Sequence, residues 1–88
     1  NPALLDTLGY VYLKQGRTAE AIETFEEVLR QAPRMEATRY HLALAYQQQG
    51  NRAKAIEQLQ TALAGDFPMK ARAEELLSKL RSSSAPGG

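Results

Sequence analysis

Apolar residues recur along this chain at intervals of three and four, the spacing that places side chains on one face of an α-helix. One such face begins with Leu5, Leu8 and Tyr12. The clearest face is formed by Ala21, Ile22, Phe25, Val28 and Leu29. The stretches between glycines and prolines are rich in strong helix formers, and β-branched residues are sparse. The pattern therefore predicts an all-α fold of five helices over residues 2–15, 18–31, 36–49, 52–64 and 68–81.

Residues at the breaks indicate where these helices begin and end. Asn1 and Pro2 suit a helix start, whereas Gly16 and Gly50 suit helix ends because glycine readily adopts the left-handed conformation. Residues 82–88 contain only Ser, Ala, Pro and Gly and have no apolar anchor, so we expect a disordered tail there.

The chain repeats itself with a period of 34 residues. Residues 1–34 and 35–68 share ten identities, where average composition gives roughly two or three. The identical pairs are Ala3/Ala37, Leu8/Leu42, Tyr12/Tyr46, Gln15/Gln49, Gly16/Gly50, Ala19/Ala53, Ala21/Ala55, Ile22/Ile56, Glu23/Glu57 and Leu29/Leu63. A fixed period of this length is typical of a stacked repeat architecture.

Each copy combines small residues, which allow two helices to cross closely, with large residues that fill the remaining volume. The first copy carries Leu5, Leu8, Gly9, Tyr12, Ala21, Phe25, Val28 and Pro33, and the second carries Leu42, Ala43, Tyr46, Ala55, Leu59 and Ala62. These residues resemble the tetratricopeptide repeat, which pairs two antiparallel helices per 34 residues. The resemblance departs at Arg39, where the family usually has a bulky apolar residue, and at Val28, where it usually has a small one.

The resemblance implies an α-solenoid domain over residues 1–81. It consists of repeat one (2–35), repeat two (36–67) and a helix (68–81) that is similar to the capping helix of such arrays. We expect the polar residues of the last helix on its outer face: Lys70, Arg72, Glu74, Glu75 and Lys79. The opening segment also resembles the C-terminal repeats of bacterial multi-repeat proteins of this family, so we expect the chain to be part of a longer protein.

Composition and charge exclude several classes of partner. Lys and Arg total 11 against 10 Asp and Glu, which gives no electrostatic reason for binding nucleic acid. No apolar run approaches the ~18 residues of a membrane-spanning helix, so no membrane insertion is predicted. The absence of cysteine excludes disulfides and thiolate metal sites. It fits either a reducing or an oxidising compartment, so the localisation stays open.

The sequence offers no catalytic site and no site for a cofactor. His41 is the only histidine, no glycine-rich phosphate loop is present, and no set of residues has metal-ligand spacing. Glutamates cluster at Glu23, Glu26 and Glu27 and again at Glu74 and Glu75. We interpret them as solvated helix faces, with Glu26 and Arg30 forming an i,i+4 pair. The protein is therefore predicted not to be an enzyme and to hold no metal.

The family resemblance implies a groove lined by the first helix of each repeat, where a peptide or helix of a partner protein binds. Its groove-facing positions correspond here to Asp6, Tyr10, Leu13, Lys14, Tyr40, His41, Leu44, Gln47 and Gln48, with Ala3, Thr7 and Ala37 beside them. One subset of the family clamps the terminal carboxylate of a peptide with Lys and Asn. The corresponding sites here hold Asp6, Tyr10 and His41, so that clamp is absent. Exposed tyrosines are common binding anchors, although Tyr10 and Tyr40 also fit simple packing between helices.

A second hypothesis is structural. Stacked repeats bury their faces only against neighbours, and the first helix carries Leu4 and Val11 on a side with no predicted neighbour. An exposed apolar strip favours self-association. The alternative function is thus a structural repeat segment that forms a homodimer through this edge helix and has no specific groove ligand.

Overall fold

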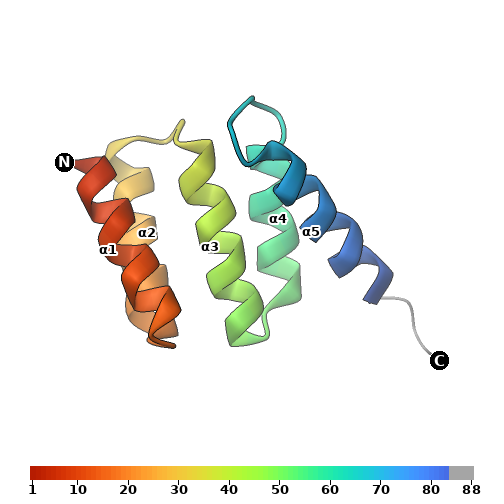
Figure 1. Cartoon of the computed structure of the whole chain (residues 1–88), viewed down its shortest axis with the longest axis horizontal. Helices are drawn as coiled ribbons and strands as arrows, with labels where there is room; N and C mark the ends of the chain where they lie inside the picture. The colour runs from red at the N-terminus through yellow and green to blue at the C-terminus, as the bar shows by residue number, and fades with distance from the viewer. Residues whose placement is uncertain (84–88) are drawn as a thin grey trace.

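The computed structural model describes residues 1–83 and consists of five helices joined by short turns. They are α1 (Pro2–Lys14), α2 (Thr18–Gln31), α3 (Glu36–Gln49), α4 (Arg52–Ala62) and α5 (Lys70–Ser83). Figure 1 shows them side by side in one row, with α1 in front of α2 and α5 at the opposite end from Asn1. The prediction of five helices without strands is confirmed over these residues.

The last helix differs from its predicted limits at both ends. Pro68 and Met69 form a turn, so α5 begins at Lys70 rather than at residue 68. The helix then continues to Ser83 and includes two residues that the sequence analysis placed in the tail. A helix terminus needs no apolar residue to extend by less than one turn, and such limits commonly shift by one or two residues. The remaining tail residues, 84–88, lie outside the described part of the chain.

Local chemistry explains where the other helices begin and end. The Asn1 side chain accepts hydrogen bonds from the backbone N–H groups of Ala3, at 3.0 Å, and of Leu4, and this satisfies donors that an α-helix leaves open at its start. Gly50 ends α3 with φ of 88°, and Gly16 follows α1 with φ of 78°. Both are left-handed conformations that glycine adopts without steric cost.

The core lies where helices cross within each pair and between neighbouring pairs. α1 packs on α2, α3 packs on α4, and α2 joins the two pairs by packing on α3. Small residues from both repeats are fully buried at these crossings: Ala21, Ala43, Ala45, Ala55 and Ala62. The largest fully buried side chains are Phe25, Leu42 and Leu59. Small residues thus lie at the helix crossings and large residues fill the remaining volume, as the repeat pattern predicts.

Leu8 does not lie in the core, although the sequence analysis placed it on the packing face of the first helix. Its side chain is 42% exposed, whereas Leu42, at the same repeat position, is 1% exposed. α3, which carries Leu42, has a preceding helix pair to pack on, because it contacts α2. Among the described residues no helix precedes α1, so the equivalent side of α1 faces solvent.

Arg39 departs from the repeat pattern, and the structure supplies its partners. Its guanidinium donates to the Gln58 side-chain carbonyl on α4 at 3.0 Å and to the Pro33 backbone carbonyl at 3.1 Å. A position that normally contributes apolar volume therefore connects α3 to α4 and to the preceding turn by hydrogen bonds.

Candidate partner-binding groove

Three adjoining cavities are lined by residues of α1, α3, α5 and the turn before α5. Their volumes are about 470, 370 and 590 Å³. The first two share Tyr10 and Leu44, and the last two share Tyr40, Leu44 and Arg72. Because each cavity shares side chains with the next, they form one continuous groove. We call it the α1–α3–α5 groove.

All nine residues predicted from the sequence lie along this groove: Asp6, Tyr10, Leu13, Lys14, Tyr40, His41, Leu44, Gln47 and Gln48. Their accessibility differs. Tyr10 is 38% exposed, whereas Leu13 is 6% exposed and belongs to the core as much as to the groove wall. Their role in binding a partner stays a prediction.

Asp6 and His41 are paired with each other beneath the groove surface. The Asp6 carboxylate oxygen Oδ1 accepts the Thr38 hydroxyl at 2.8 Å and lies 3.0 Å from His41 Nδ1. The side chains of Asp6 and His41 are only 16% and 12% exposed, and buried polar groups of this kind need such partners. The pair connects α1 to α3, so a large part of its hydrogen-bonding capacity is already used inside the protein.

Aromatic rings surround the His41 imidazole. The ring centroids of Tyr10, Phe25 and Tyr40 lie 5.0, 5.7 and 5.9 Å from it, all in tilted arrangements. Such tilted contacts lie in the distance range that aromatic pairs prefer. His41 therefore lies between the two tyrosines and packs against both. We call the pair Tyr10 and Tyr40 the aromatic floor of the groove.

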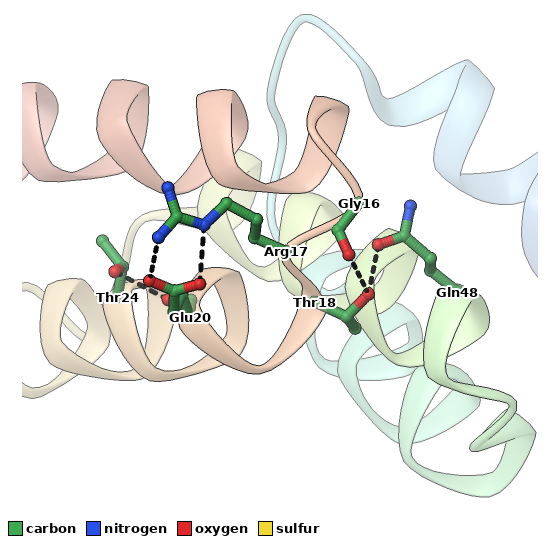
Figure 2. A network of polar contacts seen from close by, with 6 residues as sticks. All are labelled: Gly16, Arg17, Thr18, Glu20, Thr24 and Gln48. Atoms are coloured by element: carbon green, nitrogen blue, oxygen red, sulfur yellow. Dashed lines mark hydrogen bonds and ion pairs between the residues drawn. The ribbon is translucent and has the colours of Figure 1, made fainter.

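Gln48 also makes contacts within the protein. Figure 2 shows its side-chain oxygen next to the Thr18 hydroxyl, which donates to it. Its amide nitrogen donates to the Leu13 backbone carbonyl at 3.2 Å. These two bonds connect the end of α3 to the end of α1 and to the first residue of α2. Of the two glutamines, Gln47 is thus the one with a side chain available for a partner.

The structure adds a third wall to the groove that the sequence analysis did not predict. Arg72, Glu75 and Lys79 line it from α5, and Met69 lines it from the turn before that helix. All three side chains of α5 are exposed, as expected for the outer face of the last helix. The sequence analysis did not predict that this face also borders the groove beside Tyr40 and Leu44. Their spacing of three and four residues places all three on one helical stripe, which was the available signal.

Two ion pairs lie at the start and at the end of α2. Arg17 binds Glu20 through two hydrogen bonds of 2.8 Å (Figure 2), and Arg30 binds Glu27. This second pair replaces the expected Glu26–Arg30 pair. Hydrogen bonds from Gln31 and then Arg30 hold the pKa of Glu27 below its ordinary value. The α2 carboxylates thus form the solvated face that the sequence predicted.

Within residues 1–83 no group of three or more His, Cys, Asp or Glu residues is placed to hold a metal ion. None of the helices in that part of the chain combines the length and apolar character needed to cross a membrane.

A comparison with known protein families identifies a relationship over most of the chain. The sequence model of a family described as tetratricopeptide repeat matches residues 12–80, which is well over half of the chain. A search of curated protein sequences gives no significant match.

Proposed function

Since the chain belongs to the tetratricopeptide repeat family, we propose that it is a non-catalytic interaction module that binds a peptide or a helix of a partner protein in the α1–α3–α5 groove. Repeats of this family generally mediate protein–protein interactions. The observation that carries the proposal is the continuity of the groove, in which the aromatic floor of Tyr10 and Tyr40 adjoins the apolar surface of Leu44.

The groove has the physical properties that peptide recognition requires. Rigid aromatic side chains supply large contact areas at low entropic cost. Lys14, Gln47 and Arg72 stand around this floor and can bond to a peptide backbone or its side chains. The cavities have the size of ligand sites in proteins, which span about 300–1,000 Å³. A groove of this shape favours an extended peptide or one face of a helix.

The test is selection of binders from a fully randomised peptide display library. Peptides that bind wild type are measured against the variant Tyr10→Ala/Tyr40→Ala and against Gln47→Trp, which places bulk in the groove without removing core contacts. Gln60→Trp, on the exposed side of α4, is the matched control. We expect both groove variants to weaken binding at least about tenfold, since anchor residues contribute about 1.4 kcal/mol or more, and the control to bind like wild type. Selected peptides that bind all four proteins equally, or the recovery of no peptide, refute the groove.

A second candidate is self-association of two copies through the open side of α1. Leu4, Leu8 and Val11 are 68%, 42% and 44% exposed there. Their counterparts one repeat later, Thr38, Leu42 and Ala45, are at most 1% exposed. This surface of the repeat is therefore buried in the second copy and exposed to solvent in the first.

Sedimentation equilibrium across concentration tests this candidate. We expect the apparent mass of wild type to rise toward that of a dimer, and Leu8→Gln/Val11→Gln to remain monomeric. The matched control is Ala53→Gln/Ala64→Gln, which changes exposed positions in the second half of the chain. A wild-type protein that stays monomeric at every concentration removes this candidate.

A further inference from the structure

The charged side chains of the α1–α3–α5 groove favour one class of partner. The groove carries three cationic residues, Lys14, Arg72 and Lys79, and two acidic ones, Asp6 and Glu75. Asp6 contributes little to the surface, because Thr38 and His41 already bond to its carboxylate. The charge that faces a ligand is therefore mainly positive, although the whole chain has a formal net charge of only +1.

The cationic residues stand at both margins of the aromatic floor. Lys14 on α1 lies with its ammonium group 5.5 Å from the Tyr10 ring centroid. Arg72 and Lys79 stand on α5, beside Tyr40 and Leu44. Among the described residues neither Arg72 nor Lys79 forms an ion pair. Their charges are thus available to a ligand, in contrast to Arg17 and Arg30, which are paired with glutamates of α2.

From this arrangement we infer that the groove binds an acidic segment of a partner protein, which places an aromatic or large aliphatic side chain between Tyr10, Tyr40 and Leu44 and carboxylates against Arg72 and Lys79. This inference rests on the proposed function and adds the chemistry of the ligand. A guanidinium such as that of Arg72 can hold a carboxylate with two parallel hydrogen bonds. The apolar side chain fills the cavity of about 370 Å³ between the two margins, and the charges select segments of matching sign.

The experiment starts from peptides selected on wild type in the randomised display library. Each is synthesised with a fluorescent label in two forms: the selected sequence, and one in which every Asp and Glu is replaced by Asn and Gln. Binding is measured to wild type and to Arg72→Gln/Lys79→Gln. The charge-matched control Arg34→Gln/Arg52→Gln removes two exposed cations outside the groove. Glu75→Gln serves as a variant with the opposite expected sign.

We expect the selected peptides to be enriched in Asp and Glu. The amide forms should bind about 3- to 10-fold more weakly, because they lose ion pairs that are partly exposed and therefore individually weak. Arg72→Gln/Lys79→Gln should weaken the acidic forms by a similar factor and leave the amide forms unchanged. Glu75→Gln should strengthen the acidic forms. Raising the salt concentration should weaken the acidic forms and not the amide forms.

Outcomes that overturn this inference differ from those that overturn the groove itself. Peptides without acidic enrichment, equal binding of the two forms, or an equal loss in the Arg34/Arg52 control overturn the inference. If such peptides still lose binding in Tyr10→Ala/Tyr40→Ala, the groove stands with another ligand chemistry. Acidic peptides that bind the tyrosine variant as well as wild type overturn both, because they bind elsewhere.

Discussion

Gly9→Ala tests the helix crossing that forms the first repeat. A Cβ atom at Gly9 would lie 2.5 Å from Cε1 and 2.8 Å from Cδ1 of Phe25, although carbon atoms prefer separations of about 3.5–4.0 Å. Phe25 is 0% exposed, so its ring is enclosed by the core and cannot turn out toward solvent. Overpacking of this kind costs about 1–3 kcal/mol, whereas alanine favours a helix interior over glycine by about 0.5–1 kcal/mol. We therefore expect a net loss of about 1 kcal/mol.

The second repeat indicates how this loss can be reversed. Ala43 occupies the position of Gly9, and Leu59 occupies the position of Phe25; both are 0% exposed. Phe25→Leu alone should cost about 1–2 kcal/mol through the space that it leaves. In the double variant Gly9→Ala/Phe25→Leu the new methyl group occupies part of that space. We expect the double variant to lose about 1–2 kcal/mol less unfolding free energy than the two single losses added together. A coupling of this size is typical of residues in contact.

The assay is urea unfolding followed by far-ultraviolet circular dichroism on the four proteins of this cycle. An unchanged slope against urea shows that the variants change stability and not compactness. In thermal unfolding, a loss of 1 kcal/mol lowers the Tm of a domain of this size by about 4–8 °C. The reasoning is refuted if Gly9→Ala is as stable as wild type or more so, or if the two single losses simply add.

Three further predictions concern residues whose surroundings are equally well defined. Leu42→Ala should lower stability by about 2–5 kcal/mol and Leu8→Ala by less than about 1 kcal/mol, because only Leu42 is buried; urea unfolding of both variants checks this. Burial, and then a hydrogen bond to the Glu26 carboxylate, raise the pKa of Tyr46 to about 12. Because the folded state holds this proton more tightly, the stability it contributes is complete below about pH 10 and is lost as the pH rises toward 12. The stability difference between wild type and Tyr46→Phe should fall over that range by on the order of 2 kcal/mol, and a pH-independent difference would contradict the assignment. Gly50→Ala should cost about 1–2 kcal/mol, because φ of 88° is unfavourable for alanine, and a thermal midpoint equal to that of wild type would exclude this strain.

Periodicity predicted the fold well because its signals are local. Helix-forming composition and the glycines at helix ends act within one or two turns of chain, and the 34-residue repeat indicates that successive helix pairs stack. They predicted all five helices to within two residues at either end. Only the last helix is displaced at both ends, and no second repeat copy was available to define how it packs. Its direction depends on the turn through Gly65 and Pro68, and sequence pattern does not encode that geometry.

The groove was predicted in part. The walls formed by α1 and α3 were predicted from the groove-facing positions of the family, whereas the wall formed by α5 was not predicted. The polar stripe of Arg72, Glu75 and Lys79 looks the same in a sequence whether it faces bulk solvent or a groove. Hydrogen bonding within the site was also beyond the sequence, since the Asp6–His41 pair joins residues 35 positions apart.

Comparison of the two copies separates residues that build the repeat from residues that a ligand can reach. The pairs Tyr10/Leu44 and Lys14/Gln48 differ between the copies and line the groove. The Gln48 side chain, however, already forms hydrogen bonds with Thr18 and Leu13. A difference between repeats therefore indicates a ligand contact only where the side chain has no partner inside the protein. By that criterion the charge preference of the groove is determined mainly by α5, which lies outside both repeats. Two proteins with identical repeats and different last helices should then bind segments of different charge.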